Sequence, residues 1–344
     1  MADERTSTEA DWPVPWQPVV GEEDGLLARL QAWLVLGACH GATRLPESLF
    51  SLGVVGLARF AKVVDRRHAN AARRFVRLAF PEASDEAVEA RVLASYRHFL
   101  RILLQTARVC HRVPAERMVD QFDIEWTDEA RAVVESSGGS LLVTPHIGNW
   151  EAALTIARQV GLGPLYAIAK PVKNRYLSEC MQAERERRGI RLLPRRGAMV
   201  EAPKVIRAGG SIAMLLDQRA RKRPILAPFF GRPARCDRSA GVLMKRLRVP
   251  ALVFSCTLTE DPQRFRVRFY DCLSPEEIRD VDPVGIATRL NQAFERMILD
   301  EPDQYFWLHD RFKDTPEEFP EESADEDPGS SPEARTTPQG AIEA

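Results

Sequence analysis

Several patterns that would assign a chain to a common functional class are missing from this sequence. Its six cysteines are scattered, without a C-x-x-C pair, which favours reduced and mostly buried thiols on the cytoplasmic side. No apolar run reaches the roughly 18 residues that a membrane span needs, and the acidic start Met-Ala-Asp-Glu-Arg predicts no secretory signal. Neither an H-E-x-x-H motif nor an internal repeat is found. We therefore expect a folded protein without a transmembrane helix, and we expect no metal and no other cofactor.

Acidic side chains are scarce in the middle of the chain. Residues 26–313 hold 46 Lys and Arg against 32 Asp and Glu, although the formal net charge of the whole chain is −1. The acids gather in residues 1–25 and 314–344, which have little to bury and are predicted to be disordered. A basic core favours anionic partners, such as phosphate groups, phospholipid or an acidic carrier protein. Nucleic acid is a weaker candidate, because aromatic residues are not interleaved with the arginines.

Hydrophobic spacing divides residues 26–313 into two parts. Residues 26–137 are predicted to be mainly helical, since apolar side chains recur at three- and four-residue steps after the helix cap Ser84. Residues 138–313 alternate short apolar runs with helical stretches, which is typical of an α/β sheet. The predicted strands are 140–145, 165–169, 211–216, 250–257 and 265–270. The predicted helices are 149–160, 174–189, 199–208, 238–248 and one that starts at Asp282-Pro283. We expect one continuous domain.

The apolar segments 26–38 and 49–64 have two interpretations. They can be core-packing helices, or they can be amphipathic helices that enter lipid headgroups. Trp33 and the flanking cations Arg44, Arg59 and Lys62 suit the second interpretation. The sequence leaves both open.

The segment LLVTPHIGNWEAALTIA runs from a buried strand through a turn into a helix. This places His146 at the end of a strand, where open α/β sheets form their ligand crevices. Gly148 allows the backbone to approach a substrate, and the first helical N–H groups can face an anion. A carboxylate from Glu151 on one imidazole nitrogen would leave the other nitrogen to take a proton from a hydroxyl. By itself, H-x4-E is a weak pattern that also suits a capping or core histidine.

Five blocks in order resemble the bacterial lipid A biosynthesis acyltransferases, the lauroyl/myristoyl transferase family within the lysophospholipid acyltransferase-like group. The first is Asn70-Ala71-Ala72 with Phe80-Pro81-Glu82, and the second is the His146–Glu151 motif. The others are Lys170-Pro171-Val172-Lys173-Asn174 with Arg188-Gly189, then GGSIAMLLDQ (209–218) with PFFGRPA (228–234), and finally QYFWLHDRFK (304–313). The resemblance covers about residues 26–313.

This resemblance implies a mixed sheet flanked by helices, as in glycerolipid acyltransferases, and an O-acyltransferase. The enzyme would move a fatty acyl group from acyl carrier protein, or from acyl-CoA, to a hydroxyl of a phosphorylated, lipid A-precursor-like glycolipid. His146 would be the general base, oriented by Glu151, and attack would be direct because no Ser or Cys lies at the centre of the motif. The implied site is the cytoplasmic face of the inner membrane, with peripheral or monotopic attachment.

The resemblance also implies a set of substrate-binding residues, although several have a structural alternative. Asp217 can be a structural carboxylate, and Trp307, His309 and Arg311 can belong to C-terminal packing. Lys170 stands where the family commonly has arginine, so it keeps the charge without the bidentate fork. Asp310 also stands where the family often has arginine. The implied substrate-binding set is Gly148, Asn149, Lys170, Asn174, Arg188, Asp217, Gln218, Arg221 and Arg311.

Other functions remain open at this stage. The acceptor could be another membrane lipid, such as a phosphatidylinositol mannoside or an ornithine-type lipid. A non-catalytic basic module that binds membranes or carrier protein would explain the charge without any chemistry. A metallohydrolase that uses His146, Glu151, Asp217 and His309 matches no familiar ligand spacing.

Overall fold

The structure is a computed structural model that describes residues 12–14, 21–136, 138–195 and 197–319. The disorder predicted for residues 1–25 and 314–344 falls mostly outside these ranges. Four helices form the N-terminal region: α1 (Leu26–Arg44), α2 (Glu47–Val64), α3 (Arg66–Ala79) and α4 (Asp85–Arg112). Later helices and 3₁₀ turns are η2 (Ala115–Gln121), α5 (Asp128–Glu135), α6 (Trp150–Thr155), α7 (Arg175–Arg187), α8 (Ala198–Arg207), α9 (Ser239–Leu247), α10 (Pro283–Asp300) and η3 (Pro302–Gln304).

A mostly parallel sheet forms the centre of the described chain. Its seven strands lie in the order β1-β9-β8-β2-β5-β3-β4, and β9 runs antiparallel to β8. The strands are β1 (Phe122–Glu125), β2 (Ser140–Thr144), β3 (Leu165–Ala169), β4 (Ile190–Pro194), β5 (Ser211–Leu215), β8 (Ala251–Leu258) and β9 (Phe265–Leu273). A separate hairpin joins β6 (Ile225–Phe229) to β7 (Arg232–Cys236). The predicted mixed α/β fold with a helical N-terminal region is confirmed.

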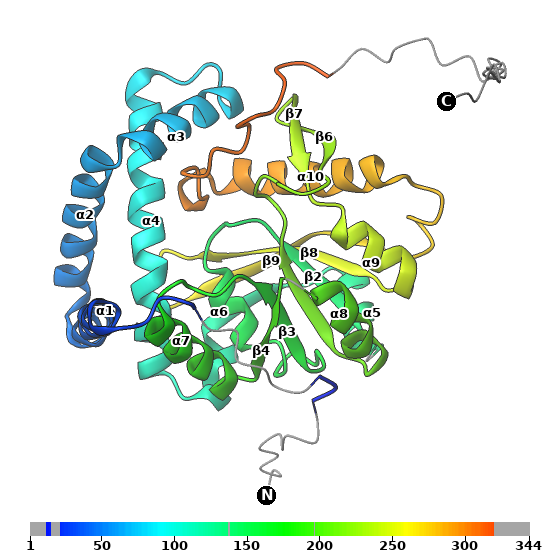
Figure 1. Cartoon of the computed structure of the whole chain (residues 1–344), viewed down its shortest axis with the longest axis horizontal. Coiled ribbons are helices and arrows are strands. Elements are labelled where there is room, and N and C mark those ends of the chain that lie inside the picture. The colour runs from blue at the N-terminus through cyan, green and yellow to red at the C-terminus, as the bar shows by residue number, and fades with distance from the viewer. Residues whose placement is uncertain (1–11, 15–20, 137, 196, 320–344) are drawn as a thin grey trace, which may run out of the picture.

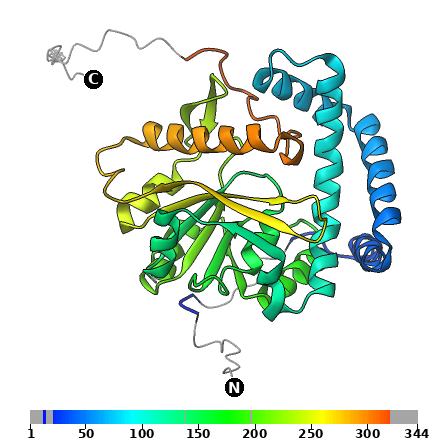
Figure 2. The same cartoon turned by 180° about the vertical axis from the view of Figure 1, so that it is seen from behind.

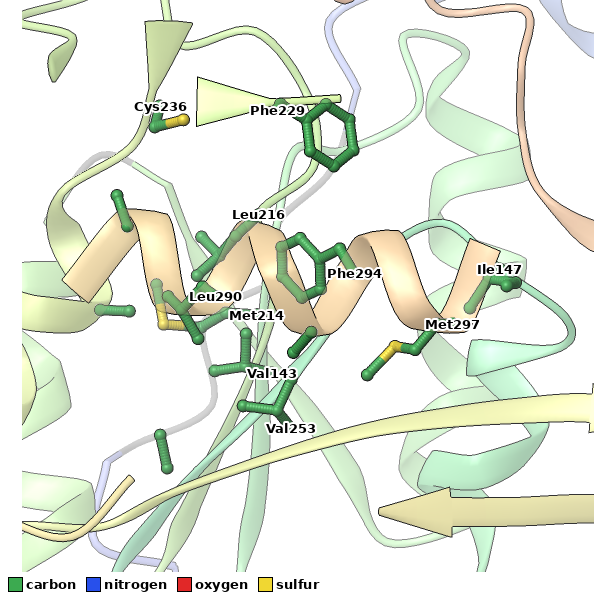
Figure 3. Close-up of a cluster of buried hydrophobic side chains, with 14 of the residues drawn as sticks. Val143, Ile147, Met214, Leu216, Phe229, Cys236, Val253, Leu290, Phe294 and Met297 are labelled. Carbon is green, nitrogen blue, oxygen red and sulfur yellow. The ribbon is translucent and has the colours of Figure 1, made fainter. Parts of the chain in front are cut away.

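Both faces of the sheet are covered, which explains why its central strands are continuous apolar runs. Alternate residues of β2 point to opposite sides. Leu141 and Val143 join the core beneath α8, α9 and α10, whereas Leu142 packs with α5 and α6 on the other face. Figure 3 shows the first of these cores, in which Leu290, Phe294 and Met297 of α10 lie over the strands. Asp282 caps α10 by accepting a hydrogen bond from Gly285, as the Asp-Pro pair predicted.

The N-terminal helices stand beside the sheet (Figures 1 and 2). Helix α4 packs against α1, α2 and α3 and reaches η3, and the predicted Ser84 cap accepts a hydrogen bond from Ala87. The outer sides of α1 and α2 are strongly apolar. Among the described residues, no helix combines the length and apolar character needed to cross a bilayer. Large hydrophobic side chains are exposed on these two helices at Leu26, Leu27, Leu30, Trp33, Leu34, Val35, Leu36, Leu49, Leu52, Leu57, Phe60, Val63 and Val64.

Candidate active site

His146 lies two residues beyond the end of β2, in a turn that the C-terminal segment holds in place. The carbonyl of His146 accepts a hydrogen bond from the Phe306 amide (3.0 Å), and Ile147 forms an antiparallel bridge with Tyr305. The Gly148 amide donates to the Gln304 carbonyl (2.9 Å). Residues more than 150 positions later therefore fix the backbone that presents the imidazole.

Asp217 is the carboxylate that contacts this imidazole. Its Oδ1 lies 2.6 Å from Nδ1 of His146, and its Oδ2 accepts the His146 amide at 3.0 Å. Asp217 follows β5 by the same two residues, and β5 pairs in parallel with β2 with Thr144 opposite Leu215. The register of the two strands therefore brings the two side chains together. Because the carboxylate accepts, Nδ1 carries the hydrogen and Nε2 keeps its lone pair.

The Asp217 carboxyl is fully buried and still charged. Burial alone would raise its pKa, but the His146 imidazole and the hydrogen bonds from His146 outweigh burial and lower the pKa. Burial, with the neighbouring Asp217 carboxylate, raises the pKa of the Tyr305 phenol well above its ordinary value. Tyr305 is thus a neutral donor beside a charged acceptor.

The expected pairing of Glu151 with His146 needs correction. Both oxygens of Glu151 instead receive the Arg185 guanidinium, with Nη2 at 2.5 Å and Nε at 3.0 Å. Glu151 lies in the first turn of α6, and Arg185 lies on α7, so the ion pair ties these helices together. Asp217 occupies the orienting position that the H-x4-E spacing had assigned to Glu151.

The remaining nitrogen of His146 faces a more open environment. The His146 side chain is about one-fifth exposed, and Nε2 lies 3.3 Å from the exposed Gln218 amide nitrogen. The Trp150 ring packs edge-on against the imidazole at 5.0 Å between centroids, and the Phe306 ring lies at 6.2 Å. One nitrogen is therefore held by a carboxylate while the other is accessible between a polar amide and aromatic walls.

Gly148 and Asn149 are placed differently from what the sequence suggested. Gly148 has a left-handed φ of 56°, and a Cβ there would lie 1.8 Å from the Cys256 carbonyl oxygen. The glycine thus permits close approach of strand β8 rather than of a substrate. The Asn149 amide donates to the Cys256 carbonyl, and its side chain caps α6 by accepting from Ala152. The backbone amides of Gly148 and Asn149 already donate to the Gln304 and Cys256 carbonyls, so they are not available to bind an anion.

The C-terminal block surrounds Asp217. The Gln304 side chain exchanges two hydrogen bonds with the backbone of Leu258, and His309 Nε2 accepts the Arg219 amide. Burial lowers the pKa of His309 to about 4, so the imidazole is neutral at physiological pH. The buried Arg311 guanidinium donates to the Arg235 carbonyl and contacts the Cys236 sulfur on the hairpin. Arg311 thus fastens the C-terminal segment instead of lining an open cleft.

The other residues implied by the resemblance have mixed placements. Asn174 is buried, caps α7 and donates to the Ala28 carbonyl, so it is a structural residue here. Arg188 is largely buried and forms an ion pair with Glu184. Lys170 and Arg221 are exposed, and neither forms an ion pair among the described residues. Among those residues, there is also no cluster of three His, Cys, Asp or Glu that could hold a metal.

Sequence reasoning missed two members of the arrangement. Arg185, the partner of Glu151, was counted only within the basic excess of residues 26–313. Asp217 was selected, but not as the partner of His146. For Asp217 a signal was present, because His146 and Asp217 each follow the end of a predicted strand, and adjacent parallel strands bring such positions together.

Comparisons with known proteins identify the family of the chain. The family model described as bacterial lipid A biosynthesis acyltransferase matches residues 25–314. The chain is 25% identical over 287 residues to the lipid A biosynthesis palmitoleoyltransferase of Escherichia coli (strain K12), covering 83% of this chain and 91% of that protein. It is also 25% identical over 296 residues to the lipid A biosynthesis lauroyltransferase of the same organism, covering 84% of this chain and 93% of that protein. With a buried carboxylate behind an accessible imidazole and a family match across most of its length, the chain belongs to the bacterial lipid A biosynthesis acyltransferase family and is an acyltransferase.

Proposed function

We propose that the enzyme transfers a fatty acyl group from an acyl carrier protein or coenzyme A thioester to a hydroxyl of a lipid A-precursor-like glycolipid. The observation that carries the proposal is the His146–Asp217 pair, whose outer nitrogen is accessible beside Gln218. The names of the two Escherichia coli relatives support the acceptor class.

The proposed mechanism needs a base but no covalent enzyme intermediate. Nε2 of His146 takes the proton as the acceptor oxygen attacks the thioester carbonyl, and the charged imidazole is stabilised by Asp217. The tetrahedral intermediate then breaks its C–S bond, and the departing thiolate receives the proton from His146. The backbone of Cys256 contacts the turn after His146, but burial raises the pKa of the Cys256 thiol strongly, so it is a poor nucleophile.

Basic side chains close to this pair suit an anionic substrate. Arg221, Lys222 and Arg223 lie three to five residues after Gln218, are exposed, and form no ion pair among the described residues. We assign this turn to the phosphate groups of the acceptor or to the acidic surface of a carrier protein. The Glu151–Arg185 pair positions α6, which starts immediately after the catalytic turn.

We further propose that α1 and α2 attach the enzyme to the cytoplasmic face of the inner membrane. Their exposed apolar side chains suit the boundary between headgroups and acyl chains. Arg59, Arg66 and Arg67 are exposed beside them and form no ion pair among the described residues, so they can meet anionic lipid headgroups. Such attachment is monotopic and brings the site to the surface that holds its acceptor.

The test uses the purified full-length protein with acyl carrier protein and coenzyme A thioesters of several chain lengths. Acceptors are lipid A precursors, a phosphatidylinositol mannoside and an ornithine lipid, and mass spectrometry detects the gain of one acyl chain. We expect His146→Ala to reduce turnover by about 10²- to 10⁴-fold. Acylation of the other lipids alone would reject the acceptor, and wild-type turnover in His146→Ala would reject the mechanism.

A further inference from the structure

A second histidine, outside the His146–Asp217 pair, contacts the catalytic turn. His98 lies on α4 and is 7% exposed, and its Nε2 is 3.0 Å from the Gly148 carbonyl oxygen. Burial lowers the pKa of His98 to about 4, so the ring is neutral at physiological pH. Since a carbonyl can only accept, the hydrogen of this neutral ring lies on Nε2 and is donated to Gly148.

The residue that His98 contacts controls the path of the turn. Gly148 follows His146 by two positions and has the left-handed conformation described above. Its amide is held by the Gln304 carbonyl, and its carbonyl is held by His98. The two hydrogen bonds fix the backbone on both sides of one residue, and they oppose rotation of the peptide planes next to His146.

Neighbouring contacts come from the same side of α4. Ser95 Oγ donates to the Tyr305 carbonyl (2.9 Å) and accepts the Trp307 amide (3.0 Å), while Thr106 exchanges a hydrogen bond with the Asn149 side chain. Positions 95, 98 and 106 are three and eleven residues apart, which is about one and three helical turns, so they share one face of the helix. This face of α4 therefore contacts both the turn after His146, at Gly148 and Asn149, and the C-terminal segment 305–307 that packs on this turn.

Close packing alone does not account for the placement of the His98 ring. His98 lines a cavity of about 360 Å³ between α2, α4, the β8–β9 turn and η3. Other residues around this cavity include Val54, Arg97 and Gln304. Part of the His98 ring therefore borders open space, and its hydrogen bond to Gly148 adds to the packing contacts that position it.

We propose that His98 is a positioning residue for acyl transfer, which holds the turn so that the imidazole of His146 points at the reacting hydroxyl. This inference rests on the proposed function and deepens it. Loss of the hydrogen bond lets the turn relax, and a displacement of a fraction of an ångström at the base lowers the rate of the chemical step. Substrate binding, which uses other surfaces, is expected to change little.

Three variants separate positioning from packing. His98→Phe keeps an aromatic ring but removes the donor, and His98→Gln restores an N–H donor. Tyr96→Phe is the matched control on α4, because it removes a hydrogen bond from the Tyr96 hydroxyl to the Asp65 carbonyl, away from the catalytic turn. The measurements are kcat, KM for donor and acceptor, and Tm.

We expect His98→Phe to lower kcat by about tenfold or more with both KM values within about twofold. His98→Gln should recover most of this loss, and Tyr96→Phe should lower Tm while kcat stays near wild type. The proposal is overturned if His98→Phe retains wild-type kcat, or if His98→Gln and His98→Phe lose activity equally in proportion to their Tm.

A second measurement does not depend on turnover. The proton on Nδ1 of His146 can be followed by NMR in the full-length protein, since its chemical shift reports the hydrogen bond to Asp217. His98→Phe should shift this resonance and Tyr96→Phe should leave it in place. If the wild-type enzyme acylates none of the acceptors, the proposed function fails. An unshifted resonance in His98→Phe would then show separately that His98 does not position the turn.

Discussion

At the scale of single residues, the chemistry depends on which carboxylate meets His146. Asp217 is buried and charged, and it binds both Nδ1 and the backbone amide of His146. The Asp217 carboxylate thus holds both the side chain and the main chain of His146 in place. A charged partner at Nδ1 stabilises the imidazolium that forms when Nε2 takes a proton.

Asp217→Asn tests this role directly. The amide has nearly the same shape but no charge, and it can present a donor where the imidazole needs an acceptor, so we expect kcat to fall by about 10²- to 10⁴-fold. Steady-state kinetics on the purified variant gives the measurement. Asp310→Asn is the control, since Asp310 is a partly exposed carboxylate of the C-terminal block that pairs with the exposed Arg74. Equal losses in the two variants would argue against a special role for Asp217.

The Glu151–Arg185 ion pair makes a different prediction. Removing Glu151 leaves the Arg185 charge, which is 18% exposed, without its partner, and removing Arg185 leaves the partly exposed Glu151 unpaired, so Glu151→Gln and Arg185→Gln should each lower stability and activity. The double variant should be little worse than either single variant, with a coupling energy on the order of 1 kcal/mol. Denaturant unfolding and kinetics on all four proteins measure the cycle. Additive losses would mean that the two side chains act independently.

Local spacing explains why Glu151 was chosen from the sequence and Asp217 was not. A carboxylate five residues from His146 is visible within one motif, whereas Asp217 is 71 positions away and depends on the pairing of β2 with β5. The motif placed His146 correctly at the end of a strand of the sheet, two residues after β2. Its partner required the strand order, which a single sequence does not display.

At the scale of elements, the exposed apolar outer sides of α1 and α2 support the proposed membrane-surface interpretation of segments 26–38 and 49–64. Each helix buries a narrow strip against the protein, for example Phe50, Val54 and Ala58 on α2. The remaining large apolar side chains stay exposed, which core-packing helices would not show.

Polar substitutions on α2 test its membrane contact. Leu52 is 69% exposed and Phe60 is 66% exposed, so Leu52→Ser with Phe60→Ser should not disturb the fold. Each change removes an apolar group worth about 1.5 kcal/mol or more at a lipid boundary, so vesicle binding should weaken by at least about tenfold. Flotation with vesicles that contain anionic lipid measures this. Val200→Ser on α8, also exposed, should bind vesicles like the wild type.

The elements that sequence patterns missed have clear physical reasons. The hairpin β6–β7 carries Pro228 and Pro233 opposite each other, and proline argues against a strand in the interior of a sheet. Its turn at Phe230 and Gly231 has positive φ at both residues, which matches a tight hairpin. Strands β1 and β4 lie at the two edges of the sheet and carry charged residues among their apolar ones (Asp123, Glu125 and Arg191), so their apolar signal is weak. The central strands, buried on both faces, were predicted to within a few residues.

At the scale of the whole molecule, buried neutral histidines couple stability to pH. Burial lowers the pKa of both His98 and His309 to about 4, from the ordinary value of 6.5. As pH falls below about 6.5, these two histidines bind protons in the unfolded chain, but in the folded chain they stay neutral until about pH 4. The stability from these groups is therefore complete above pH 6.5 and is lost as pH falls toward 4.

His98→Gln isolates one part of this effect. For His98 the difference in pKa corresponds to about 3 kcal/mol between the two ends of the window. Urea unfolding of wild type and His98→Gln at several pH values between 7.5 and 4.5 measures the free energy of unfolding. The wild type should lose stability more steeply than the variant on acidification. Parallel curves would mean that His98 does not stay neutral in the fold.

The bonds from Gln304 and Phe306 to the catalytic turn have a consequence for the order in which the enzyme is completed. His146 and Asp217 leave the ribosome long before the residues that lock their backbone. A nascent chain that ends before residue 304 holds the base and its carboxylate but lacks the Gln304 and Phe306 contacts. We therefore expect the backbone geometry of this turn, and with it the proposed acyl transfer, to be completed only once residues 304–306 have been added.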